Sequence, residues 1–264
     1  MKARQFQTAQ GGRLTWFETG QGRPLVLLHG WAMSAAAFDE LAGLLAMNFR
    51  VLAPDLPGHG ESSPAVQNDL AGVSGLLTDW LAALEVGPCA LVGWSLGGML
   101  SLQIVSDGVL PVQRLVLMGS TPKFTIGEDW PYGLPATQVR AMARNLKRQF
   151  EPTLAEFFAL TFAGVTISIG RLRAIRNFAV RASSLPDQNA AFALLNMLAE
   201  QDQRDIELGQ VDPRQRDHAA PGQQARHQQS RPHMSMPMPH ASSFSRRGSS
   251  SPPSGSHVSV TLAT

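Results

Sequence analysis

The sequence predicts an α/β fold, in which a doubly wound, mostly parallel sheet is covered by crossover helices and carries an inserted helical lid. Two observations support this prediction. From Arg23 to Met118, short apolar runs alternate with longer amphipathic stretches, as they do in sheets built from crossover units. After Met118 the alternation stops, and about 80 residues follow with helical periodicity that prolines interrupt.

The core is predicted from runs that have apolar residues on both faces, which is typical of buried parallel strands. The predicted strands are residues 24–28, 50–53, 89–92 and 114–118. Helices are predicted between or beside them at residues 35–46, 69–84 and 97–105. We therefore assign residues 1–121 to the core of the fold.

Prolines divide the next part of the chain into separate helical stretches rather than strand–helix units. The predicted helices are residues 136–150, 153–162, 169–181 and 187–203. We interpret residues 122–200 as the lid and residues 201–210 as the return toward the core.

The last part of the chain, residues 211–264, has a different composition. It contains 11 Ser, 7 Pro and 5 of the 7 His, with six Arg against two Asp. Only eight of its residues are large and apolar. Such a segment buries too little surface to offset its chain entropy. We expect a disordered tail, and we expect the last strands of the sheet to be absent.

The motif that carries chemistry is Gly93-Trp94-Ser95-Leu96-Gly97-Gly98, between a predicted strand and a predicted helix. Glycines two residues before and after a serine permit a strained turn that lifts the hydroxyl above the sheet. The helix N-terminus that follows favours a developing oxyanion. We predict that Ser95 is a catalytic nucleophile. The alternative is an ordinary strand-to-helix turn.

Two other loops follow strands of the core. In His29-Gly30-Trp31, the backbone N–H of Trp31 is predicted to form an oxyanion hole together with that of Leu96. We expect His29 to be a structural histidine rather than a base. Asp55 and His59 suggest a second dyad, but the turn-forming residues around them favour stabilisation of a loop.

The runs LVLLHGW, DLPGHGES and LVGWSLGG, followed by a helical lid, resemble the α/β-hydrolase superfamily. Within it they are most similar to the pimeloyl-ACP methyl ester carboxylesterase (BioH-type) family of biotin synthesis. The resemblance covers roughly residues 14–210. It implies an esterase whose substrate contacts Trp31, Ser95 and Leu96. The lid residues that it adds to the substrate site are Phe157, Phe158, Ala159, Leu160 and Thr161.

The lid is rich in basic residues, which suits an acidic partner. The resemblance implies docking of an acyl carrier protein that bears an acyl methyl ester. The candidate docking residues are Arg140, Arg144, Arg148, Arg173 and Arg176. The alternative is a solvated basic face without a partner.

A serine nucleophile needs a histidine base and a carboxylate that orients it. In this fold both come late in the chain, yet the sequence after Asp212 offers neither a strand nor a Gly-His loop. Asp212 or Asp217 with His240 or His257 has the right order, but no strand would hold such a pair near Ser95. The triad Asp and His therefore stay unassigned. We hypothesise that residues 211–264 are a frameshifted tail, and we expect activity to be impaired.

Three functions remain open: the carrier-linked methyl esterase, another esterase or thioesterase of the same fold, and a non-catalytic scaffold that binds an acyl group or a carrier protein.

The single cysteine, Cys89, excludes a disulfide framework. No apolar run reaches the length of a membrane helix, and the first 12 residues are too polar for a signal peptide. We expect a cytoplasmic monomer that requires no cofactor or metal and binds neither nucleic acid nor membrane.

Overall fold

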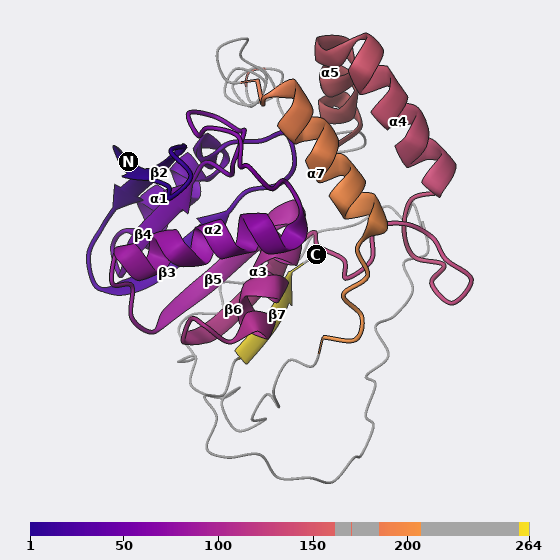
Figure 1. Cartoon of the computed structure of the whole chain (residues 1–264). Helices are drawn as coiled ribbons and strands as arrows, with labels where there is room; N and C mark the ends of the chain where they lie inside the picture. Colours follow the sequence, from indigo (N-terminus) through magenta and orange to yellow (C-terminus); the bar gives the residue numbers. More distant parts are fainter. Residues whose placement is uncertain (162–169, 171–184, 207–258, 264) are drawn as a thin grey trace, which may run out of the picture.

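The computed structural model describes residues 1–161, 170, 185–206 and 259–263. Within this part of the chain a seven-stranded sheet forms the centre of the molecule, in the order β1-β2-β4-β3-β5-β6-β7 (Figure 1). The strands are β1 (Lys2–Gln7), β2 (Arg13–Thr19), β3 (Arg23–Leu28), β4 (Phe49–Pro54), β5 (Cys89–Trp94), β6 (Val112–Met118) and β7 (Ser259–Ala263). Strands β4, β3, β5, β6 and β7 run parallel to one another, whereas β2 pairs in the antiparallel sense with both β1 and β4.

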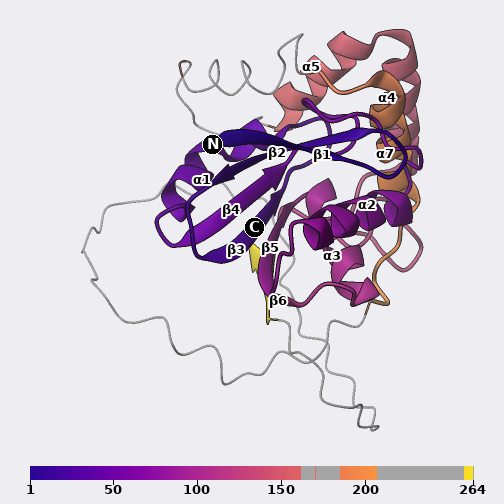
Figure 2. The same cartoon turned by 60° about the vertical axis from the view of Figure 1, so that its left-hand side comes forward.

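Helices cover both faces of the sheet (Figure 2). One face packs against η1 (Ala35–Phe38) and α1 (Asp39–Leu45), and the other packs against α2 (Leu70–Ala83) and α3 (Leu96–Asp107). Strand β3 shows how the sequence specifies this arrangement. Leu25 and Leu27 belong to the apolar cluster on the face covered by η1 and α1, while Val26 and Leu28 belong to the cluster on the face covered by α2 and α3. Alternate side chains of a strand point to opposite faces, so an unbroken apolar run serves both cores.

Strands β1 and β2 were not among the predicted elements. They form an antiparallel hairpin, closed by the hydrogen bond from Thr8 N to Gly12 O at 2.8 Å. Strand β1 is at the sheet edge and is almost entirely exposed, so its polar sequence lacks the apolar pattern of the inner strands.

Residues 259–263 correct the prediction for the tail. They form β7, which pairs in parallel with β6 from Arg114↔Ser259 to Met118↔Ala263. The expectation that no strand of the sheet occurs in this segment is therefore wrong for these five residues. The run Ser-Val-Thr-Leu-Ala has β-branched residues that favour extended backbone, and the edge of β6 offers unpaired backbone groups. Sequence reasoning judged the segment by its average composition and overlooked this short run. The rest of the tail, residues 211–258 and 264, lies outside the described residues, as do residues 207–210 before it.

The lid helices lie beyond the carboxyl ends of the parallel strands (Figure 1). They are α4 (Ala136–Arg148), α5 (Phe150–Thr161) and α7 (Gln188–Glu200), and α4 packs against both of the others. These bounds agree with three of the predicted lid helices to within a few residues. The fourth, at residues 169–181, falls almost entirely outside the described residues.

Candidate active site

Ser95 occupies the sharp turn between β5 and α3. Its backbone angles are φ 53° and ψ −112°, a conformation that residues other than glycine rarely adopt. The neighbouring glycines allow the turn because strand and helix come very close. A Cβ atom on Gly97 would lie 2.1 Å from the carbonyl oxygen of Leu28, and one on Gly93 would lie 2.4 Å from that of Gly97. The motif thus has the geometry of a strained nucleophile turn.

Backbone hydrogen bonds hold this turn in place. The N–H of Ser95 donates to the carbonyl oxygen of Met118 at 2.9 Å, at the end of β6. The hydroxyl of Ser120 donates to the carbonyl oxygen of Ser95 at 3.1 Å. Ser95 is also the N-cap residue of α3, so the positive end of that helix lies at the serine.

The loop after β3 passes directly beside Ser95. A Cβ atom on Gly30 would lie 3.4 Å from the Cβ of Ser95. The next residue, Trp31, is buried, and its indole N–H donates to the carbonyl oxygen of Ala191 in α7 at 2.8 Å. Its ring meets that of Phe157 edge to face, with 4.9 Å between centroids. Trp31 therefore ties the core to two lid helices next to the serine.

Ser95 opens into a cavity of about 600 Å³ between the core and the lid. This volume is in the range of sites that bind small molecules. The walls are mostly apolar, with a few amide and hydroxyl groups and one carboxylate, that of Glu156. Such a cavity suits a hydrocarbon chain whose reactive end reaches the serine.

Five of the eight predicted substrate residues line this cavity, namely Trp31, Ser95, Phe157, Leu160 and Thr161. The other three do not. Leu96 is fully buried at the start of α3, and Phe158 is packed in the core with 3% of its surface exposed. Ala159 is exposed on α5, because one turn of helix presents only part of a continuous segment to one side.

The other eleven lining residues were not among the predicted substrate residues. They are Phe124, Leu134, Gln138, Val139, Ala141, Met142, Asn145, Thr153, Glu156, Leu195 and Leu198. The helical periodicity of α4 could have indicated its lining residues, since Gln138, Ala141, Met142 and Asn145 are spaced as one helix face. No sequence pattern identifies Phe124 or Leu134, because the loop that carries them is irregular.

His29 is a structural residue, as expected from the sequence. Its Nδ1 lies 2.8 Å from the carbonyl oxygen of Gly30, and its Nε2 accepts the N–H of Leu56 at 2.9 Å. Burial, reinforced by the nearby His59, lowers the pKa of His29 to about 3. The ring is therefore neutral, with both nitrogens engaged by backbone.

His59 has the same kind of environment. Its Nδ1 lies 3.0 Å from the carbonyl oxygen of Pro57, and its Nε2 accepts the N–H of Ala32 at 3.2 Å. Burial lowers its pKa to about 4. Its ring centroid lies 5.5 Å from that of His29. His29 and His59 are the histidines of the described residues, and neither offers a free nitrogen to Ser95.

Asp55 stabilises its own loop, as the turn-forming residues predicted. Its carboxylate oxygens accept the N–H of Ala35 at 2.8 Å and the N–H of Glu61 at 2.9 Å. Burial raises the pKa of Asp55 to about 6, although these two hydrogen bonds oppose the shift. A Cβ atom on Gly60 would lie 2.2 Å from the same carboxylate, so the turn closes tightly around it.

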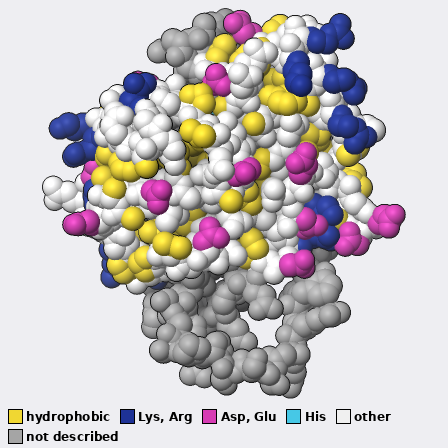
Figure 3. All heavy atoms as spheres, in the orientation of Figure 1, with side chains coloured by type: hydrophobic (Ala, Val, Ile, Leu, Met, Phe, Trp, Pro, Cys, Tyr) yellow, Lys and Arg dark blue, Asp and Glu magenta, His cyan; other side chains and the backbone are white. Residues whose placement is uncertain are grey.

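The basic lid residues that the structure describes lie on the outside of α4. Arg140, Arg144 and Arg148 are exposed, and Figure 3 shows Lys and Arg side chains gathered over this helix. Lys147 lies over the ring of Phe192, 4.0 Å from its centroid. Arg173 and Arg176 lie outside the described residues.

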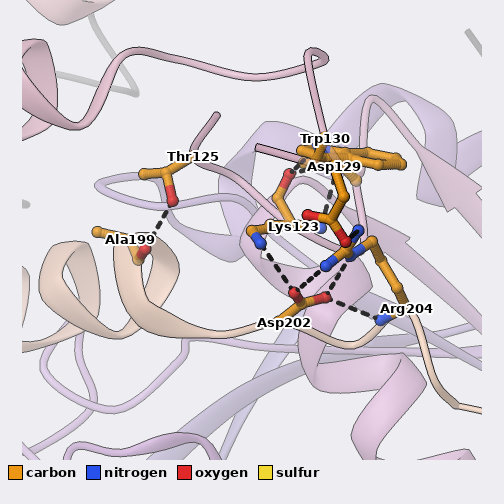
Figure 4. A network of polar contacts seen from close by, with 8 residues as sticks. Lys123, Thr125, Asp129, Trp130, Ala199, Asp202 and Arg204 are labelled. Carbon is orange, nitrogen blue, oxygen red and sulfur yellow. Dashed lines mark hydrogen bonds and ion pairs between the residues drawn. The ribbon is translucent and has the colours of Figure 1, made fainter. Parts of the chain in front are cut away.

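A polar network at the base of the lid joins the loop after β6, residues 123–130, to the end of α7 and the segment that follows it, residues 199–204 (Figure 4). The carboxylate of Asp202 binds Lys123 at 3.0 Å and Arg204 at 2.7 Å, and Arg204 also binds Asp129 at 2.8 Å. The hydroxyl of Thr125 donates to the carbonyl oxygen of Ala199, at the end of α7, at 2.9 Å. These bonds connect the loop that carries Phe124 and Leu134 to the helix that carries Leu195 and Leu198, which are all cavity residues.

Among the described residues, no cluster of His, Cys, Asp and Glu could hold a metal ion. Within the same residues, no helix is both long and apolar enough to span a membrane.

Comparison with known proteins identifies relatives of the chain. Residues 23–206 match the family model described as alpha/beta hydrolase fold. A pimeloyl-[acyl-carrier protein] methyl ester esterase from Vibrio cholerae serotype O1 is 34% identical over 194 residues, which is 73% of each chain. Another, from Nitrosospira multiformis, is 37% identical over 148 residues, which is 55% of this chain but only 56% of the relative. The chain thus spans little more than half the length of that relative.

Solved structures support the fold. An esterase from Exiguobacterium antarcticum has a TM-score of 0.71 at 24% identity, over 78% of this chain and 76% of the other. A bromoperoxidase from Bacillus anthracis has a TM-score of 0.70 at 22% identity, over 77% and 76%. At these identities the likeness concerns the arrangement of helices and strands.

Proposed function

The chain belongs to the α/β-hydrolase family, and from this premise we propose that it is built as a serine carboxylic-ester hydrolase. The observation that carries the proposal is the strained turn of Ser95, with φ 53°, which lines a mostly apolar cavity of about 600 Å³. The finer proposal is that the substrate is a pimeloyl-type methyl ester carried on an acyl carrier protein. It is supported by relatives that are named for that activity.

The reaction would proceed through an acyl-enzyme. The Oγ of Ser95 attacks the ester carbonyl carbon and its proton passes to a base, while the carbonyl oxygen becomes an oxyanion that accepts the N–H groups of Trp31 and Leu96. The tetrahedral intermediate then expels the methoxy group, which leaves as methanol after protonation. Water attacks the acyl-enzyme, which releases the acid and restores the serine.

The lid would bind the acyl chain and its carrier. Phe157, Leu160 and Thr161 line the cavity and would contact the chain, with Phe158 and Ala159 in the adjoining turn. The exposed Arg140, Arg144 and Arg148 would attract an acidic carrier protein, and we include Arg173 and Arg176 in this docking surface.

One observation favours a second candidate, a scaffold that binds acyl groups without turnover. Within the described part of the chain, both histidines have their ring nitrogens engaged by backbone, and the loop after β6, Gly119 to Pro122, contains no acid. Without a base, the turnover number of a serine hydrolase falls by about 10⁶-fold. We therefore propose that hydrolysis by this chain is impaired.

Labelling with a fluorophosphonate probe distinguishes the two candidates. Labelling of the native chain well above that of a denatured control, and abolished by Ser95→Ala, would support an active serine hydrolase and would contradict impairment. Labelling at the rate of the denatured control, with acyl esters still bound, would support the scaffold and exclude a functional hydrolase.

A further inference from the structure

The cavity beside Ser95 contains one charged side chain among its described lining residues, and that side chain is Glu156. The other lining residues are apolar or carry neutral hydroxyl or amide groups. A single carboxylate in such an environment bears directly on which acyl groups the cavity accepts, because no other described lining residue carries a charge that could compensate it.

Helix geometry places Glu156 on the side of α5 that faces the cavity. Glu156, Phe157 and Leu160 follow Thr153 by three, four and seven residues, which places all four on one face of an α-helix, and all four line the cavity. Glu156 and Leu160 are also exposed, so this part of the lining lies where the cavity meets solvent. Ser95 lines the same cavity at the core.

Within the described part of the lid, Arg140 and Arg144 of α4 do not cancel this charge from within the cavity. On α4, the lining face consists of Gln138, Ala141, Met142 and Asn145. Arg140 lies two residues and Arg144 six residues after Gln138, which turns both of them well away from that face, and both are exposed. In the described part of the lid, the charge that lines the cavity is therefore that of Glu156, whereas Arg140 and Arg144 lie on the other side of α4.

We propose that Glu156 determines specificity by rejecting esters whose far end carries a carboxylate, in favour of esters whose far end is neutral or positively charged. This inference rests on the proposed function only in that the ester end lies at Ser95. A far carboxylate at about 4 Å from Glu156 would lose about fivefold in affinity even with water-like screening, and an ammonium group would gain by a similar factor. A thioester that masks the far carboxylate, as a carrier-linked acyl chain has, escapes the repulsion.

The test measures binding, so that it does not depend on turnover. The full chain is loaded with the neutral dye Nile red, which is then displaced by methyl octanoate, by monomethyl suberate or by methyl 8-aminooctanoate. We expect the aminoester to bind tightest and the half-acid weakest, at least fivefold apart. In Glu156→Gln the two should differ less than twofold. High salt should also reduce the discrimination, because the site is partly exposed.

The matched control is Glu151→Gln. Glu151 is exposed on the same helix, but it precedes Thr153 by two residues and so lies about 200° around the helix from it. Removing this charge should leave the discrimination intact. Equal effects of the two substitutions, no effect of Glu156→Gln, or failure of all three esters to displace the dye would overturn the proposal. If discrimination depends on Glu156 while fluorophosphonate does not label Ser95, this inference stands and the hydrolase function fails.

Discussion

Gly97 offers a sharp test of how the nucleophile turn is built. This glycine is in the first turn of α3, where alanine has the higher helix propensity, so propensity alone predicts that Gly97→Ala stabilises the protein by about 0.5–1 kcal/mol. The structure predicts the opposite. The added Cβ would lie 2.1 Å from the carbonyl oxygen of Leu28, 2.5 Å from its carbonyl carbon and 2.9 Å from the carbonyl oxygen of His29.

These neighbours are backbone atoms of β3 and the loop after it, so no side chain can rotate away. Relief requires α3 to move away from the sheet, and overpacking of this kind costs about 1–3 kcal/mol or more. For a chain of this size, 3 kcal/mol lowers the melting temperature by about 6–12 °C. The same shift would displace Ser95, so fluorophosphonate labelling, where the native chain shows it, should also fall.

Gly75→Ala is the matched control. Gly75 is in the middle of α2, and a Cβ atom there would meet no atom within 4 Å. This substitution should raise the melting temperature by about 1–4 °C, through helix propensity and a less flexible unfolded chain. Urea and thermal unfolding, followed by tryptophan fluorescence, measure both effects. A Gly97→Ala variant as stable as Gly75→Ala would refute the close approach of helix and strand.

Stability should rise with pH between about 4 and 6. Buried His29 and His59 have pKa values lowered to about 3 and about 4, so the unfolded chain, with a histidine pKa of about 6.5, binds more protons in this range. Asp55, with its pKa raised to about 6, binds a proton in the folded state that it releases in the unfolded state, which offsets one of the two histidine protons. The free energy of unfolding should therefore rise by about 1.4 kcal/mol per pH unit from the three groups, which urea unfolding measures. A flat profile would contradict this prediction. Trp31→Phe removes the indole N–H that a carbonyl of α7 accepts, and it should cost about 1–3 kcal/mol in the same assay; an unchanged unfolding midpoint would show that this bond is unimportant. Asp202→Asn should weaken the ion pairs at the base of the lid and lower Nile red affinity more at low salt than at high salt; equal loss at both would exclude an electrostatic role.

The core of the fold could be predicted because its sequence signals are local and consistent. Each inner strand is a short apolar run, and β5 is followed at once by the glycines that only a strained turn requires. The same pattern identifies Ser95 and the direction of α3. Here local preference and tertiary structure agree, which is the condition under which a sequence pattern is informative.

The hairpin and the last strand could not be predicted in this way. Strand β1 is exposed at the sheet edge, so no burial pattern marks it. Strand β7 joins β6 from a distance of about 140 residues, and only the open edge of β6 explains its position. The cavity wall has the same difficulty. Phe124 and Leu195 both line it although they are far apart in the sequence, and no local sequence pattern indicates that their segments come together.

The composition of residues 211–264 leads to a last prediction, about the gene. In the whole chain Arg outnumbers Lys by 19 to 3, as in proteins encoded by G+C-rich DNA. Such DNA, when it is translated out of frame, yields Arg, Pro, Ser, His and Gln, and these residues are abundant in the segment 211–264. The family match ends at residue 206, shortly before this composition begins. We expect one of the other two frames beyond codon 212 to encode an apolar strand, an acid after it and a Gly-His loop, which are the parts that Ser95 lacks within the described residues. Translating both frames decides the matter. If neither contains those three features, the frameshift hypothesis is wrong.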